Sequence, residues 1–168
     1  MEKHSKGLKI EVGLNAGDFL LEWKRSALVA NYLADFMAYE YPHREMAENL
    51  ISTVLNELIE AAYRLAVDRS PLQLLLRTED GHLIIALDHQ CQPGLSSTYR
   101  EFVGQLVQGS DGPLYFQLLE AETRPEPLFN QFGLAMIAHD FSGQITVEDL
   151  GTTQLRTTID LPTKELSA

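Results

Sequence analysis

Two helical stretches follow one another in the first half of the chain, and they constrain the fold more than any other feature. In the first, from Asp18 to Pro42, large apolar residues recur every three or four positions, which predicts a helix with one apolar face. Asp18 is a suitable N-cap and Pro42 ends the pattern. The second helix is predicted from about Glu45 to Val67. The apolar faces of the two helices comprise Phe19, Leu20, Trp23, Leu28, Leu33, Phe36, Met37, Leu50, Val54, Leu55, Leu58, Ala61, Ala62 and Leu65.

Three short strand patterns lie on either side of these helices. Apolar and polar residues alternate from Leu8 to Val12, which predicts a half-buried strand suited to the edge of a sheet. Two apolar runs, 72–77 and 82–87, are separated by a segment containing Asp80 and Gly81. Because Asp-Gly favours the tightest hairpin turns, these runs are predicted to be adjacent antiparallel strands.

The second half of the chain alternates short helical patterns with loops. A short helix is predicted from Ser97 to Val107. Near the end of the chain, two strand patterns predict a closing hairpin. Glycine and proline mark most of the boundaries. The remaining predicted elements are a helical piece at 112–119, an exposed loop at 122–127, a helix at 129–141 capped by Gly143, strands at 144–148 and 155–161, and a tail from Thr163.

This order of elements predicts an α/β fold of the α+β kind. A two-layer sandwich satisfies it, with a mixed, mostly antiparallel sheet and the helices on one face. The chain has 168 residues, of which 45% are hydrophobic, a size that suits one domain with one core. We therefore expect a single domain over 1–168, with its core at about 8–162 and a lid-like excursion at about 93–127.

Charge and composition narrow the classes of partner. The formal net charge is −11, which argues against nucleic acid or an anionic membrane surface, since both require a basic surface. Cys91, the single cysteine, cannot form an internal disulfide. The first six residues lack the apolar segment of a secretory signal, and no apolar run is long enough to cross a bilayer. We expect a cytoplasmic protein whose partners are proteins or small ligands.

Five short motifs, taken in order, resemble a known family. They are the segments 57–62 (Glu-Leu-Ile-Glu-Ala-Ala), 83–94, 132–135 (Phe-Gly-Leu-Ala), 143–147 and 158–162. In this order and spacing the chain resembles the ATP-binding domain shared by gyrase, heat-shock chaperones, histidine kinases and mismatch-repair proteins, the GHKL family. The strand followed by two helices at the start is most similar to the anti-sigma-factor serine kinases and SiaB-like regulators of bacterial partner switching.

The resemblance implies roles for individual residues. Glu57 matches the glutamate that orients or deprotonates the attacking hydroxyl, although an exposed charge on an amphipathic helix is an equally good interpretation. One helical turn on, the position of the Mg²⁺ ligand holds Ala61, which has no donor atom, and Glu60 points about 100° away. The resemblance places the other ATP-pocket positions, in vestigial form, at Asp88, Gly94, Gly133 and Thr158.

Two glycine-dependent turns of the family are also altered. Before Gly94 the adenine loop has His89-Gln90-Cys91-Gln92 where the family has glycines. In the phosphate turn one glycine, Gly133, is left beside Gln131 and Phe132, and it is alternatively a helix-packing glycine. His89 and Cys91 lack a second pair of ligands, so no metal site is predicted. The combined losses predict that no cofactor is bound, with ATP and Mg²⁺ retained only if the chain is an active kinase.

These observations predict a bacterial signalling protein that acts by binding a partner and does not turn over ATP. The partner class implied by the resemblance is a STAS-domain antagonist, a sigma-like factor, or a sensor or response-regulator protein. One alternative is an active serine/threonine kinase that phosphorylates a STAS-like antagonist with Glu57 and Asp88, and with Glu60 as an unusual Mg²⁺ ligand. Another is a structural domain that forms a homodimer by pairing the Leu8–Val12 edge strands.

Overall fold

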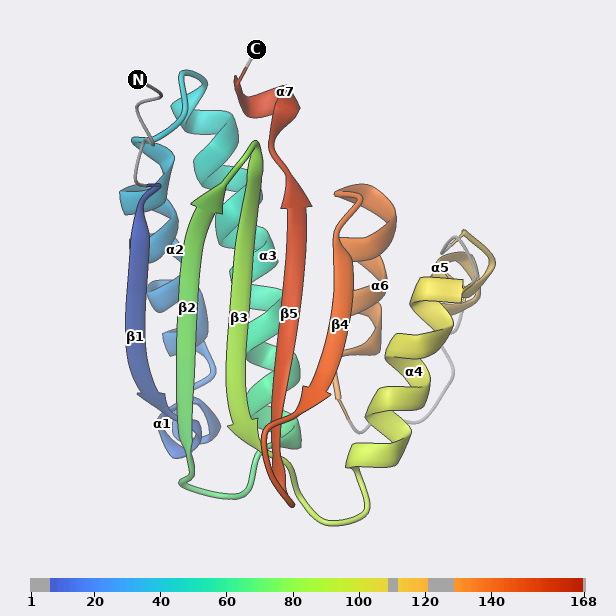
Figure 1. Ribbon diagram of the computed structural model, residues 1–168. Helices are drawn as coiled ribbons and strands as arrows, with labels where there is room; N and C mark the ends of the chain where they lie inside the picture. Colours follow the sequence, from blue (N-terminus) through green and yellow to red (C-terminus); the bar gives the residue numbers. More distant parts are fainter. Residues whose placement is uncertain (1–6, 109–111, 121–128, 168) are drawn as a thin grey trace.

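The protein has two layers, a five-stranded sheet and a layer of helices packed on one of its faces (Figure 1). The computed structural model describes residues 7–108, 112–120 and 129–167. The strands lie in the order β1-β2-β3-β5-β4, so that β1 and β4 form the two edges. The predicted two-layer α+β class is confirmed. All pairs among the described strands are antiparallel, so the mostly antiparallel character that was predicted is confirmed and no parallel pair is present among them.

The chain begins with the edge strand β1 (Lys9–Asn15), which pairs along its whole length with β2. Its apolar residues are half-buried and alternate with exposed ones, as the sequence pattern predicts. The other side of β1 has no strand beside it among the described residues. The predicted edge strand is therefore confirmed, three residues longer than expected at its end.

The predicted helix from Asp18 to Pro42 is two helices, α1 (Ala16–Leu21) and α2 (Lys24–Ala38). Asn15 caps α1, because its side-chain oxygen accepts from the Gly17 backbone N–H at 2.9 Å. The prediction that Asp18 is the N-cap was wrong, since Asn15, three residues earlier, accepts from the free backbone amide at the start of the helix. At Glu22 the backbone is extended, with φ −148° and ψ 96°, and this interrupts the helix.

The inward face of α2 differs from the predicted one. Small residues dominate it, chiefly Ala30, Ala34 and Ala38, together with Leu33 and Met37. Small side chains allow α2 to lie close to its neighbour α3. The predicted core positions Leu20, Trp23, Leu28 and Phe36 are exposed instead, so that part of the prediction was wrong.

The long helix α3 (Arg44–Leu65) crosses the back of the sheet and carries most of the helix-side core. Its predicted inward residues are buried, except for Leu50, which is half-buried. A hydrogen bond of 2.9 Å from the Ser26 hydroxyl to the Asn56 side-chain oxygen joins α2 to α3. The predicted bounds of this helix were correct to within two residues.

The hairpin of β2 (Pro71–Glu79) and β3 (His82–Gln90) forms as predicted. Its turn residues Asp80 and Gly81 both have positive φ, 45° and 80°. That combination is the signature of the type I′ turn that Asp-Gly favours. The backbone of this turn is therefore the one that its two residues favour.

Three helices follow: α4 (Ser96–Gln108), α5 (Gly112–Leu119) and α6 (Gln131–Asp140). Their predicted positions are confirmed to within two residues, while the predicted loop at 122–127 and part of the 93–127 excursion lie outside the described residues. After α6 the residue with a left-handed backbone is Ser142, with φ 54°. The helix cap was predicted at Gly143, so that prediction was wrong by one residue. Gly143 instead packs against Ile137, whose carbonyl accepts its N–H at 3.0 Å.

The chain closes with the hairpin of β4 (Gln144–Asp149) and β5 (Gln154–Pro162), which inserts β5 between β4 and β3. The predicted tail forms one short helix, α7 (Lys164–Ser167). Thr163 joins this end to the β2–β3 turn, since its backbone N–H and its hydroxyl both donate to the Gly81 carbonyl, at 2.9 and 2.8 Å. The second predicted hairpin is thus confirmed.

Candidate functional site

The carboxylate of Glu57 lies against the start of α6. Glu57 is half-buried on α3, and Asn130 is the N-cap residue of α6. The Asn130 side-chain nitrogen donates to the Glu57 Oε2 at 2.6 Å and to the Glu57 backbone carbonyl at 3.2 Å. Asparagine before a helix is a recognisable capping signal, so Asn130 is a residue that sequence reasoning could have found.

Gly133 lies at the same contact. A Cβ built on Gly133 would overlap the Glu57 carboxylate and the Asn130 side chain, so a larger residue here would displace these side chains. The two segments are more than 70 positions apart in the sequence, and the structure brings Glu57 and Gly133 together as the resemblance implies. Direct packing between α3 and α6 also supports the alternative interpretation of Gly133 as a helix-packing glycine.

Two of the first backbone amides of α6 are bonded within the protein. The Gln131 N–H donates to the Phe129 carbonyl at 2.8 Å, and the Gly133 N–H donates to the Asn130 side-chain oxygen at 3.1 Å. A phosphate bound at a helix N-terminus needs such amides to be free. Asn130 therefore takes the place that an anion would occupy on the Gly133 amide.

Ala61, at the expected Mg²⁺-ligand position, is buried in the core. Glu60 makes an ion pair with Arg64 at 3.2 Å, one turn further along α3, and burial raises the pKa of the Glu60 carboxyl. Glu60 therefore points along α3 toward Arg64. Within the parts of the chain that the structure describes, no group of three or more histidine, cysteine, aspartate or glutamate side chains is arranged to hold a metal ion.

Asp88 and Thr158 lie on the face of the sheet opposite the helices. In β3 the buried residues Leu83, Ile85, Leu87 and His89 face the helix layer, and Asp88 falls between them on the other face. Arg156, its cross-strand partner in β5, binds the Asp88 carboxylate through two hydrogen bonds of 2.7 and 2.8 Å. Thr158 shares the alternation of Arg156 and lies on the same outer face.

The inward neighbour of Asp88 is His89, which is fully buried beside Tyr99 of α4. Both ring nitrogens of His89 lack a hydrogen-bond partner among the described residues. Desolvation lowers the pKa of His89 to about 4, against a smaller opposing effect of the Asp88 charge. Cys91 is also buried, which raises the pKa of its thiol, and the two do not form part of a ligand group in the described residues.

Aromatic rings fill the helix side of the sheet at this end. Tyr99 and Phe102 of α4 each make edge-to-face contacts with Phe129, with ring centroids 5.5 Å apart in both cases. The Tyr99 hydroxyl lies 2.6 Å from the hydroxyl of Thr157, the inward neighbour of Thr158. Sequence reasoning missed Tyr99 and Thr157, because only the register of β5 shows which threonine faces inward.

Gly94 lies in the connection between β3 and α4, with a positive φ of 86° and open space where a Cβ would be. Its role there is conformational, since a left-handed backbone favours glycine. The predicted pocket residues thus separate into two groups. Glu57 and Gly133 meet in the helix layer, whereas Asp88 and Thr158 lie on the outer face of the sheet.

The residues that the resemblance assigns to a Mg²⁺-ATP pocket have other contacts in the structure. The carboxylate of Asp88, one of the predicted pocket positions, is bound to Arg156 on the face of the sheet opposite the helices, and the α6 amide of Gly133 is capped by Asn130. The Mg²⁺-ligand position is an alanine. No chemical step that uses the nucleotide is therefore derived from this arrangement.

Comparison with models of known protein families finds no match, and comparison with curated proteins finds none either. The resemblance to the GHKL family accordingly stays a prediction from the sequence motifs. In the described residues, no helix has both the length and the apolar character needed to cross a membrane.

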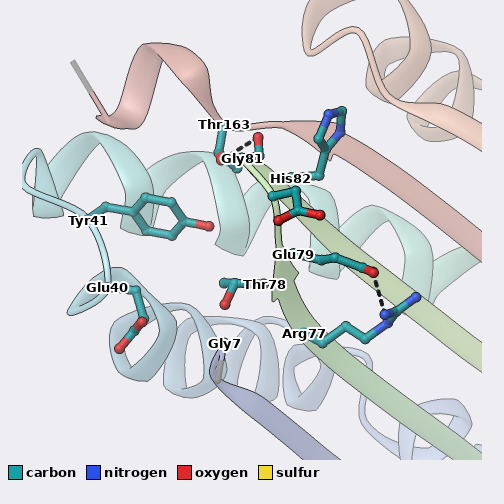
Figure 2. A pocket seen from close by; sticks show the side chains of 10 residues that line it. Gly7, Glu40, Tyr41, Arg77, Thr78, Glu79, Gly81, His82 and Thr163 are labelled. Atoms are coloured by element: carbon teal, nitrogen blue, oxygen red, sulfur yellow. Dashed lines mark hydrogen bonds and ion pairs between the residues drawn. The ribbon is translucent and has the colours of Figure 1, made fainter. Parts of the chain in front are cut away.

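A polar cavity of about 580 Å³ opens at the other end of the sheet, around the β2–β3 turn (Figure 2). Tyr41 extends into it from the connection between α2 and α3, and Arg77 in its lining is paired with Glu79. The carboxylates in its lining, those of Glu40, Glu79 and Asp80, disfavour an anionic ligand. None of the predicted site residues lines this cavity.

Proposed function

We propose that this chain is a GHKL-type regulator that acts by binding a partner protein and does not turn over ATP. The proposal rests mainly on one observation, the contact of Asn130 with both Glu57 and the Gly133 amide. This contact uses the expected catalytic carboxylate and the expected phosphate-binding amide for packing α3 against α6. The burial of Ala61 and the Asp88–Arg156 pair support the same conclusion.

The partner class follows from the resemblance to the anti-sigma-factor kinases and partner-switch regulators. It is a STAS-domain antagonist, a sigma-like factor, or a sensor or response-regulator protein. The net charge of −11 favours association with a basic surface on that partner. Binding should accordingly become slower as salt is added, because screening weakens long-range attraction.

Calorimetric titration of the purified protein with ATP and Mg²⁺ tests the proposal. We expect no binding at millimolar nucleotide, and no phosphate transfer to STAS-domain proteins incubated with labelled ATP. An Ala61→Asn variant is the matched comparison. A micromolar dissociation constant for Mg²⁺-ATP in the parent, together with a phosphorylated partner, would overturn the proposal.

An active serine/threonine kinase is the second function that the structure leaves for testing. It is favoured by one observation: the carboxylate of Glu57, which the resemblance matches to the catalytic glutamate, lies at the N-terminus of α6. If this function is correct, Glu57→Gln abolishes phosphate transfer and leaves the fold intact, as measured by circular dichroism. An unchanged transfer rate in that variant would reject it.

A further inference from the structure

The cavity around the β2–β3 turn is lined by segments that are distant in sequence. Tyr41 belongs to the connection between α2 and α3, Thr78 belongs to β2, and Thr163 follows β5. Both the backbone N–H and the hydroxyl of Thr163 donate to the carbonyl of Gly81 in the turn, so two of these segments are joined directly. The volume of about 580 Å³ is in the range of cavities that bind small molecules. The cavity therefore has a defined shape and room for a small organic group.

The Tyr41 hydroxyl is a buried polar group that extends into this cavity (Figure 2). The residue is 8% exposed, and its hydroxyl oxygen has no hydrogen-bond partner among the residues that the structure describes. Burial raises the pKa of Tyr41, against a smaller opposite effect of the Thr163 hydroxyl, so the Tyr41 hydroxyl stays protonated and can accept as well as donate. A buried polar group without a partner is costly. A ligand atom bound to this oxygen would remove that cost.

Negative charge exceeds positive charge in the lining. The positive charge of Arg77 is paired with Glu79, and the ring of His82 is bonded at 2.6 Å to a carboxylate of β5. Glu40 and Asp80, by contrast, have no ion pair within the described parts of the chain. Two carboxylates that are not neutralised by the chain itself attract a cation and repel an anion. The charge of the lining thus selects a positively charged ligand.

Thr78 adds a second hydroxyl on the same side of the sheet as Tyr41. The buried leucines of β2 face the helix layer, and Thr78, which is half-buried, is in phase with them. Arg77 and Glu79 fall on the other face of the strand. Hydroxyl and carboxylate oxygens all accept hydrogen bonds. The helix side of the cavity is therefore suited to a ligand that carries donors.

We propose that this cavity binds a primary ammonium group, with the Tyr41 hydroxyl as a hydrogen-bond acceptor and the carboxylates of Glu40 and Asp80 as the source of the electrostatic attraction. An ammonium group has three donors and no acceptor, which matches this lining. A neutral polyol would leave the two carboxylates without a counter-charge. The inference is independent of the proposed function. Free amines and lysine side chains both carry the group, and the experiments below distinguish these two sources.

Calorimetric titration with putrescine, a linear diamine, tests the site. We expect saturable binding at millimolar concentrations, and no binding of butanediol, which has the same chain length and hydroxyls in place of the ammonium groups. Tyr41→Phe should raise the dissociation constant about fivefold, because it removes one hydrogen bond and keeps the ring. The matched control is Tyr32→Phe, at an exposed tyrosine of α2 outside the lining, which should bind like the parent.

Charge variants test the attraction separately from the hydroxyl. Glu40→Gln and Asp80→Asn keep the shape of each side chain, and Asn-Gly favours the same turn as Asp-Gly. Each should weaken putrescine binding by about threefold or more, since each removes one negative charge near the ligand. Glu101→Gln, at an exposed position of α4 outside the lining, changes the net charge equally and should have little effect.

A lysine blocked at both its amino and carboxyl ends identifies the source of the ammonium group. Tighter binding of the blocked lysine than of putrescine would identify a lysine side chain of another protein, and the reverse order would identify a free amine. Three results would overturn the proposal: no binding of either probe, equal binding of butanediol, or putrescine binding that Tyr41→Phe and both charge variants leave unchanged.

Discussion

Asn130 joins two helices through one side chain, donating to the Glu57 carboxylate at 2.6 Å and accepting from the Gly133 N–H at 3.1 Å. This contact explains why a glutamate, an asparagine and a glycine converge where the resemblance places a catalytic site. Each of the three has a structural role that needs no nucleotide. Measurements of stability can therefore distinguish packing from catalysis at these positions.

Asn130→Ala should destabilise the protein by about 1–2 kcal/mol, because it removes the N-cap of α6 and leaves the half-buried Glu57 carboxylate without its amide donor. Urea denaturation followed by circular dichroism measures the change. Asn49→Ala, at an exposed position of α3, is the control and should shift the midpoint little. Equal effects of the two substitutions would show that the Asn130 contact contributes nothing to stability.

Gly133→Ala should cost about 1–3 kcal/mol, because the added methyl overlaps Asn130, which its capping hydrogen bond holds in place. The Glu57 carboxylate can swing aside more easily. Gly104→Ala in α4 is the matched control, since open space surrounds that position, and it should stabilise the protein by about 0.5–1 kcal/mol through helix propensity. Thermal unfolding of both variants measures the two changes in stability, which should have opposite signs. A stabilising Gly133→Ala would contradict the close packing of α3 and α6.

His89 should make the protein less stable in mild acid. Its pKa is about 4 in the folded protein and about 6.5 in the unfolded chain, so the unfolded state binds the proton first. Stability is complete above pH 6.5, falls as the pH decreases toward 4, and the loss from this residue reaches about 3 kcal/mol, at about 1.4 kcal/mol per pKa unit. Urea denaturation at pH 7 and pH 5 measures it, and His89→Leu should reduce the difference. An unchanged pH dependence in the variant would reject this role.

The Asp88–Arg156 pair should show a coupling free energy of about 1 kcal/mol in a double-mutant cycle with Asp88→Asn and Arg156→Gln. Two parallel hydrogen bonds and partial burial favour a measurable value. The exposed Lys9–Glu11 pair, 3.0 Å apart on β1, is the control and should couple little. No coupling between Asp88 and Arg156 would mean that the carboxylate is free to act elsewhere.

Much of the fold could be predicted from the sequence, because local rules determine it. The Asp80-Gly81 turn specifies the β2–β3 hairpin through its own backbone preferences, and the period of the apolar residues locates α3 to within two residues. Glu57 and Gly133, to which the resemblance assigns separate roles, lie together in the structure. The assignment of these residues to a vestigial ATP pocket stays a prediction.

Tertiary structure decided which face each side chain occupies. A shift of one residue in a strand moves a side chain to the other face, so the register of β3 against β5 turns His89 inward and pairs Asp88 with Arg156 outside. On α2, alanines and large apolar residues form two faces that are both nonpolar, and the sequence pattern alone cannot choose between them. Close packing against α3 selects the alanine face, and this leaves Leu28, Tyr32 and Phe36 in solvent. Periodicity along one chain thus determined the helices and strands, while orientation depended on contacts between segments that are distant in sequence.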